Sequence, residues 1–321
     1  MLKRRHIVLV LVLLCSVLFI ALAVVPRLTD NFLNCDDGIK YLIGVSQSSL
    51  IDYPWLIAMN EEIKAETEKN EDIKIIFYDA AGDNNKQKQD IENMVKQGVD
   101  LIIVTPNDSE YLSETIGKVY SQGTPVIVMG HGINMDKCTM SIFCDDKKIG
   151  MYAGEYAAKL LGNKGGTILE IQGDPSLQIS EERKKGFREA ISKYPEIKVV
   201  YTVVGYWQRD KTEERVGEIF RKEPKVDLVF AHSDEMAIGT WRVATRENLK
   251  IEFISIGGLP IKINGLDFIR NGLIDATFKY PTGGREAISY ALRILNGEKV
   301  PRAVELKTSL ITKDNVNEYE N

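Results

Sequence analysis

Short apolar runs alternate with longer amphipathic stretches along almost the whole chain from residue 41 onward. Between the runs, apolar residues recur every three or four positions, as at Leu56, Met59 and Ile63, which is the spacing of an amphipathic helix. Apolar strands that alternate with helices indicate parallel sheets covered by helices on both faces. The pattern therefore predicts an α/β protein whose strands lie at 41–45, 74–78, 100–104, 125–129, 167–171, 199–204, 227–231, 252–256 and 275–278.

Two parts of the sequence resemble each other at a separation of about 127 residues. Val99-Asp100-Leu101 leads to Asn107-Asp108, and Val226-Asp227-Leu228 leads to Ser233-Asp234. We interpret this weak repeat as two doubly wound sheets, in which ligands bind beyond the carboxyl ends of the strands. We expect Asp234 to cap the N-terminus of its helix and not to bind ligand.

Composition limits the possible partners. The chain has 321 residues, 44% of them hydrophobic and 27% charged, which excludes a disordered protein and is enough for about two domains. The first 25 residues hold three of the 41 basic residues and no acidic one. The remainder therefore contains 38 basic and 46 acidic residues. This balance argues against a surface that coats nucleic acid, and no helix-turn-helix precedes the body.

The N-terminus resembles a membrane segment. Lys3, Arg4 and Arg5 precede an uncharged run at 7–25, which as a helix would span roughly 28 Å, close to the hydrocarbon core of a bilayer. We predict an N-terminal transmembrane helix within residues 1–28, with a cytoplasmic N-terminus and an extracytoplasmic body. The alternative is a signal peptide cleaved near Ala23, which would release the protein to the periplasm or the exterior.

The motifs of the common enzyme classes are missing. No G-x-G-x-x-G follows a strand, no G-x-S-x-G is present, and the three histidines are scattered, so neither a dinucleotide site nor a hydrolase triad is supported. The cysteines and histidines show no zinc-ligand spacing, and we predict no cofactor and no metal. A Cys138–Cys144 disulfide is conceivable, but two small apolar residues beside a strand is the favoured interpretation.

Several segments together resemble the type I periplasmic binding proteins, the ribose- and galactose-binding group. They are Ile43-Gly44-Val45-Ser46, Tyr53-Pro54-Trp55, Gly98-Val99-Asp100-Leu101-Ile102-Ile103, Gly154-Glu155-Tyr156-Ala157-Ala158, Arg183-Lys184-Lys185-Gly186-Phe187, Trp207-Gln208-Arg209 and Ser233-Asp234-Glu235-Met236-Ala237-Ile238-Gly239. The resemblance covers roughly residues 41 to 311. It is specific for the fold and much less specific for the ligand.

The resemblance implies two doubly wound parallel-sheet lobes joined by three crossover strands, which close on a small ligand. The N-lobe is expected at 40–145 plus 280–307 and the C-lobe at 146–279 plus 308–321. The crossings are expected near 145–148, 279–282 and 306–308.

The resemblance also implies a set of ligand-binding residues. Trp55 and Trp207 stand where aromatic rings stack on a sugar, whose C–H faces suit flat aromatic surfaces. Arg183 stands where an arginine donates to ring and hydroxyl oxygens. The alternative roles are packing for the tryptophans and an exposed helix charge for Arg183. The full expected set is Ser46, Tyr53, Trp55, Thr105, His131, Arg183, Trp207, Ser233 and Lys279.

The sequence departs from the family pattern at several of these positions. Ser233 and Gly257 replace an amide and an acid of the family, and Lys279 replaces an amide. A cleft that gains lysine and loses carboxylates would favour an anionic ligand, such as a phosphorylated or acidic sugar. In the alternative, Lys279 points out from the hinge, or Asp52 or Asp108 supplies the missing acceptor.

These observations predict an anchored extracytoplasmic solute-binding protein that captures a small polar ligand, with a carbohydrate favoured, for an ABC transporter permease. The first alternative is a ligand-sensing subunit that signals to a membrane histidine kinase. An enzyme on the same fold is a third option, disfavoured because the sequence offers no nucleophile–base pair.

Overall fold

The computed structural model describes residues 38–130, 133–222, 225–259 and 265–319. The predicted transmembrane helix within 1–28 and the expected ligand residue His131 both fall outside these ranges. Among the helices that are described, none has the length and apolar character needed to cross a bilayer. Both sheets described below belong to the unit Tyr41–Asn321.

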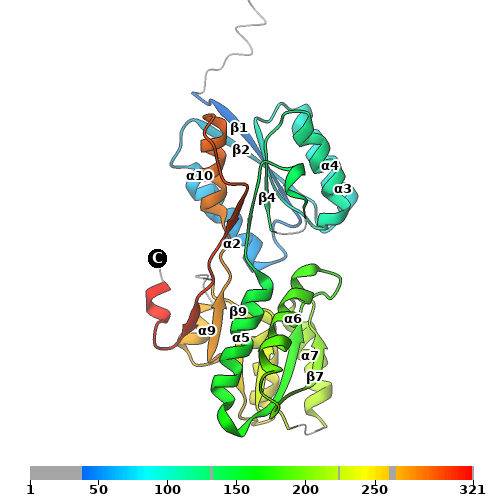
Figure 1. Cartoon of the computed structure of the whole chain (residues 1–321), viewed down its shortest axis with the longest axis vertical. Helices are drawn as coiled ribbons and strands as arrows, with labels where there is room; N and C mark the ends of the chain where they lie inside the picture. Colours follow the sequence, from blue (N-terminus) through cyan, green and yellow to red (C-terminus); the bar gives the residue numbers. More distant parts are fainter. Residues whose placement is uncertain (1–37, 131–132, 223–224, 260–264, 320–321) are drawn as a thin grey trace, which may run out of the picture. The chain divides into compact units, whose positions relative to one another are not determined.

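The first sheet, with the helices on it, forms the N-lobe (Figure 1). Its six strands run in the order β11-β5-β4-β3-β1-β2, and all of their pairings are parallel. The strands are β1 Tyr41–Gln47, β2 Ile73–Asp79, β3 Leu101–Thr105, β4 Val126–Met129, β5 Met140–Phe143 and β11 Ala303–Glu305. The helices are α2 Pro54–Thr67, α3 Asn84–Lys96, α4 Ser109–Ser121 and α10 Gly284–Leu295, with a 3₁₀ turn at Met135–Lys137.

The second sheet, with its helices, forms the C-lobe and repeats the same arrangement. Its order is β12-β10-β9-β8-β6-β7, so the weak sequence repeat corresponds to two sheets with equivalent strand order. The strands are β6 Gly166–Gln172, β7 Ile197–Val204, β8 Leu228–Ala231, β9 Glu252–Gly257, β10 Ala276–Lys279 and β12 Leu310–Thr312. The helices are α5 Asp146–Leu161, α6 Gln178–Ile191, α7 Arg209–Phe220, α8 Asp234–Arg246 and α9 Leu266–Arg270, with 3₁₀ turns at Gly162–Lys164 and Val316–Tyr319.

Each sheet is covered on both faces, which explains why its strands carry mostly apolar residues on both faces. In the N-lobe, Ile103 packs with residues of α2 and α10, whereas its neighbours Ile102 and Val104 pack with α3 and α4. In the C-lobe, Ile168 faces α5 and α6 and Leu169 faces α7 and α8. Successive side chains of a strand point to opposite faces, so both sets must be apolar, and the prediction of two helix-covered parallel-sheet lobes is confirmed.

The chain passes between the two sheets after β5, after β10 and after β11 (Figure 1). The first passage is short, because Cys144 and Asp145 alone separate β5 from α5. The expected crossing at 145–148 was therefore placed too late, since Asp146 already belongs to α5. Cys144 and Cys138 are both buried and unlinked, as the favoured interpretation of these residues predicted.

Three strands escaped the sequence analysis, namely β5, β11 and β12. Strands β11 and β12 have three residues each, and β5 has four with Ser141 interrupting its apolar run, so no apolar pattern stands out from the surrounding loop. Strand β12 also pairs antiparallel with β10, so the second sheet is not wholly parallel.

The aspartates of the repeat have structural roles. Asp100 accepts a hydrogen bond from the backbone N–H of Leu42, and Asp227 accepts one from that of Thr167, so each ties two neighbouring strands together. Asp108 caps α4 by accepting from the Tyr111 N–H. In the second copy the cap is Ser233, so the prediction that Asp234 caps α8 is wrong.

Candidate functional site

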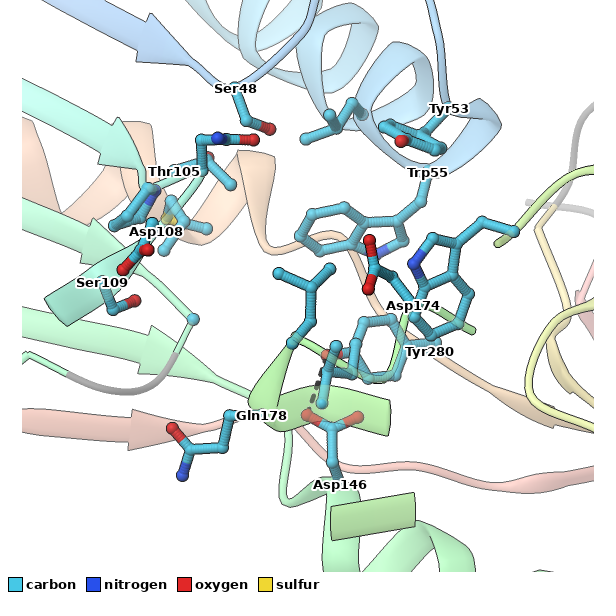
Figure 2. A pocket seen from close by; sticks show the side chains of 18 of the residues that line it. Ser48, Tyr53, Trp55, Thr105, Asp108, Ser109, Asp146, Asp174, Gln178 and Tyr280 are labelled. Atoms are coloured by element: carbon cyan, nitrogen blue, oxygen red, sulfur yellow. Dashed lines mark hydrogen bonds between the residues drawn. The ribbon is translucent and has the colours of Figure 1, made fainter. Parts of the chain in front are cut away.

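A cavity of about 1620 Å³ lies where the strands of both sheets end. Residues that follow the carboxyl ends of β1, β3 and β4 line it from the N-lobe, and residues that follow β6, β7, β8 and β9 line it from the C-lobe. This is the edge at which doubly wound sheets bind ligands. Figure 2 shows Ser48, Thr105, Asp108 and Ser109 on one side of the cavity and Trp55, Tyr280 and Asp174 on the other.

Six of the nine expected ligand residues line this cavity: Tyr53, Trp55, Thr105, Arg183, Trp207 and Ser233. The hydroxyls of two of these residues, Thr105 and Ser233, make contacts within their own lobe. The Thr105 hydroxyl contacts the Met59 sulfur at 3.7 Å, and the Ser233 hydroxyl accepts from the backbone N–H of Met236, because α8 begins there and leaves that donor without a helical partner.

Ser46 and Lys279 do not belong to the lining. Strand β1 continues to Gln47, so Ser46 is buried inside the sheet, 1% exposed, and accepts from the Gln87 amide. The lining residue at this strand end is Ser48. Lys279 ends β10, and its ammonium lies 5.6 Å from the centre of the Tyr319 ring. Because side chains alternate along a strand, the next residue, Tyr280, faces the cavity instead.

Trp55 is fixed at the second passage between the lobes. It follows Pro54, whose ring favours the first turn of α2. Its indole N–H donates to the carbonyl oxygen of Pro281 at 3.3 Å, and its ring lies 5.6 Å from that of Tyr280. One face of this part of the cavity is therefore aromatic and held at the hinge.

Trp207 presents a second aromatic surface from the C-lobe. It lies in the turn between β7 and α7 with φ of +63°, after Tyr206 with φ of +53°, a conformation that costs non-glycine residues energy. The ring packs so closely on Gly173 that a Cβ there would come within 2.0 Å of it. Glycine at 173 therefore allows the tryptophan to lie against the end of β6.

Arg183 is buried and not an exposed helix charge, with 3% of its surface exposed. Its Nε donates to Asp146 Oδ1 at 2.9 Å, and its Nη1 donates to the carbonyl oxygen of His232. The guanidinium carbon lies 4.5 Å from the centre of the Tyr280 ring and 5.5 Å from that of Trp207. The guanidinium of Arg183 therefore lies close to two aromatic rings, and its hydrogen bonds to Asp146 and His232 fix its orientation.

Asp146, Tyr280 and Asp174 are lining residues that the sequence analysis missed. Asp146 Oδ2 accepts from the Tyr280 hydroxyl at 3.2 Å (Figure 2). Burial raises the pKa of the Tyr280 phenol, and the nearby Asp146 raises it further, so the phenol keeps its proton and can donate. Burial also raises the pKa of Tyr53, together with Asp52 and Asp174. The alternation of Phe278, Lys279 and Tyr280 was the one sequence signal available for Tyr280.

Asp234, adjacent to the Ser233 cap, is a buried acceptor. Its carboxylate accepts hydrogen bonds from the hydroxyls of Ser255 and Thr277 at 2.6 and 2.7 Å. It also accepts one from the backbone N–H of Gly258 at 2.8 Å. It thereby joins the ends of β9 and β10 to the start of α8.

The cavity is not basic. Among its described lining residues, nine carboxylates stand against four cationic side chains, Lys137, Lys147, Arg183 and Lys211; the carboxylates are Asp108, Glu110, Glu114, Asp145, Asp146, Asp174, Glu182, Asp234 and Glu235. The hypothesis of an anionic ligand assumed Lys279 in the cleft and few acids around it. Neither condition holds, and Asp108, which the alternative named as a possible acceptor, lines the cavity.

Residues 43–299 match the family described as periplasmic binding protein domain. The chain belongs to this family. Among curated proteins, this periplasmic binding protein is 28% identical to the ribose import binding protein of Bacillus subtilis (strain 168) over 276 residues, which is 85% of this chain and 88% of the relative.

Two solved structures extend the comparison. The fructose-binding periplasmic domain of a hybrid two-component system is 33% identical, with a TM-score of 0.80 over 87% of this chain and 93% of that one. A solute-binding protein of an ABC transporter from Bacillus halodurans C-125, solved with myo-inositol, is 26% identical, with a TM-score of 0.81 over 89% of this chain and 99% of that one. All three are named for binding a sugar or another solute, in agreement with the prediction that this chain is a binding protein and not an enzyme.

Proposed function

We propose that this periplasmic binding protein reversibly captures a neutral, polyhydroxylated small molecule, a monosaccharide or a cyclic polyol, for uptake by an ABC transporter. The observation that carries the proposal is the pairing of aromatic surfaces with the fixed guanidinium of Arg183 in one cavity. Aromatic faces complement the C–H faces of sugars, and guanidinium and carboxylate groups complement their hydroxyls. The names of the relatives, which include ribose, fructose and myo-inositol, support the same class of ligand.

Binding is expected to work by selecting a closed arrangement of the lobes. The cavity exceeds the roughly 300–1000 Å³ of common small-molecule sites. A ligand that touches both lobes binds the closed arrangement more tightly and so increases its population.

The test is calorimetric titration of the full chain with D-ribose, D-fructose, D-allose, xylitol and myo-inositol, in a detergent without a sugar head group. At least one should bind, and a hundredfold excess over its dissociation constant should stabilise the fold by about 2.7 kcal/mol. Binding of none of these compounds, with tight binding of a sugar phosphate or an amino acid instead, would contradict the proposal.

Trp207 offers a direct test of stacking. Trp207→Ala should weaken the best neutral sugar by about 1–3 kcal/mol, which is roughly 5- to 150-fold, because the ring face is lost. Trp207→Phe should recover much of this loss. Trp241 packs against the same C-lobe core as Trp207 but does not line the cavity, so Trp241→Ala should lower the melting temperature and leave the affinity intact. Equal affinity losses in both alanine variants would indicate a packing role for Trp207.

A sensing role is the second candidate, favoured by the two-component relative. The two roles can be separated by deleting the gene in a strain that expresses its sugar permease from a constitutive promoter. Transport predicts that uptake of radiolabelled sugar falls to background. Sensing through a membrane histidine kinase predicts normal uptake with loss of the transcriptional response to the sugar.

The attachment of the protein is part of the same proposal. The uncharged run at 7–25 should keep the full-length chain in the membrane fraction after carbonate washing, with the N-terminus in the cytoplasm. Intact-mass analysis of the membrane fraction should give the uncleaved chain. A mature chain that begins near Val24 would instead favour the cleaved alternative.

A further inference from the structure

Arg183 and Asp146 form a buried ion pair within the cavity. Their side chains are 4% and 6% exposed, and the Nε–Oδ1 distance is 2.9 Å. Moving either charge from water to such a site is costly unless the other neutralises it. The pair thus keeps the buried part of the cavity close to neutral.

Close packing of α5 on α6 places the two side chains together. A Cβ at Gly150 would lie 2.2 Å from the carbonyl oxygen of Arg183, and one at Gly186 would lie 1.9 Å from that of Lys147. Glycine at both positions lets the two backbones touch. As a result Asp146, at the start of α5, lies beside Arg183 on the buried face of α6.

Asp146 is held at both oxygens, by Arg183 at Oδ1 and by the Tyr280 hydroxyl at Oδ2. The rings of Tyr280 and Trp207 flank the guanidinium. Its cationic charge is therefore matched inside the protein before any ligand arrives, and the remaining N–H groups can serve neutral hydroxyl or ring oxygens.

We infer that Asp146 is a specificity-determining residue that neutralises Arg183, so that the site accepts neutral sugars and rejects phosphorylated or acidic ones. The inference rests on the proposed binding of a neutral polyhydroxylated ligand. A phosphate or carboxylate near Arg183 would have to compete with Asp146 for the same cation and would meet its like charge at short range. Glu182 and Asp174, which also line the cavity, add to this repulsion.

The test compares each neutral compound with its own phosphate: D-ribose with D-ribose 5-phosphate, D-fructose with D-fructose 6-phosphate, and myo-inositol with myo-inositol 1-phosphate. For the pair whose neutral member the wild type binds best, calorimetry gives the ratio of the two dissociation constants. Asp146→Asn leaves the cation of Arg183 unpaired, so the preference for the neutral compound should fall at least tenfold. The variant is nearly isosteric, so the cavity keeps its shape.

Glu170→Gln is the matched control. Glu170 is fully buried in the C-lobe, where it pairs with the partly exposed Arg188 and with His232, but it does not line the cavity. Its replacement should destabilise the fold and leave the selectivity ratio within threefold of the wild type. An equal change of ratio in both variants would assign the effect to general destabilisation and overturn the inference.

Arg183→Gln gives a second test, because it should shift the preference of the site towards cationic ligands instead of anionic ones. This test applies even if Asp146→Asn does not fold. Asp146 then keeps its negative charge without the cation of Arg183, and the glutamine keeps one amide donor at this position. Competition at millimolar ligand should therefore favour the amino-sugar analogue of the neutral compound that the wild type binds best, at least tenfold more than in the wild type. If the wild type binds no neutral compound, the proposed function fails. If it does bind one and neither variant shifts its ratio by more than threefold, the inference alone fails.

Discussion

Arg183→Met is expected to reduce the affinity for the best neutral sugar by more than a hundredfold. The substitution removes a planar set of hydrogen-bond donors, and it removes the cation that pairs with the buried carboxylate of Asp146. Breaking a buried pair from one side costs about 3–5 kcal/mol. Titration calorimetry should therefore give no measurable heat, while chemical denaturation should show a large loss of stability.

Arg188→Met is the control for the Arg183 experiment. Arg188 lies on the same helix and pairs with the buried Glu170, but it does not line the cavity. Its loss should lower stability and leave affinity within a few-fold of the wild type. If Arg183→Met retained wild-type affinity, the guanidinium would not be a ligand group.

Gly186→Ala is expected to have the largest effect on stability among single-methyl changes. The new Cβ would overlap the carbonyl oxygen of Lys147 and lie 2.9 Å from the N–H nitrogen of Met151. Backbone atoms in two packed helices cannot yield as a flexible side chain would, so α5 and α6 must separate. We expect about 2–3 kcal/mol of destabilisation, measured by denaturant unfolding.

The same separation should also weaken ligand binding, since it parts Asp146 from Arg183. Gly217→Ala is the matched control, because Gly217 lies within α7 and a Cβ there meets nothing within 4 Å. That variant should be about 0.5–1 kcal/mol more stable than the wild type, owing to the lower helix propensity of glycine. Comparable stabilities of the two variants would contradict the account of helix contact given above.

The sequence predicted the architecture well because both faces of each sheet are buried. A strand such as β4 is then apolar at every position, which makes it recognisable in the sequence as a continuous apolar run. Strands β11 and β12 were missed for the opposite reason: they are short, and their pairing partners β5 and β10 are distant in sequence. Their identity as strands depends on the neighbouring strand, which no local pattern encodes.

The lining of the cavity was predictable at positions whose residue type has a specific binding chemistry, as aromatic rings and guanidinium groups do. Trp55, Trp207 and Arg183 carry large specific side chains, and all three line the cavity. Ser46 was misplaced because β1 runs two residues further than expected, to Gln47. Lys279 was misplaced by one residue, and the direction of a side chain reverses at each step along a strand. An error of one position at Lys279 therefore replaced Tyr280, which lines the cavity, with a residue near Tyr319.

The sequence by itself determined the two doubly wound lobes and the aromatic and guanidinium groups that line the cavity, because periodicity and residue chemistry are local properties. The tertiary structure alone decided the charge of the site. Asp146 and Arg183 are 37 residues apart, and they meet because glycines let two helices touch. Whether a charge is neutralised depends on its neighbours in space, and these are fixed only when the chain folds.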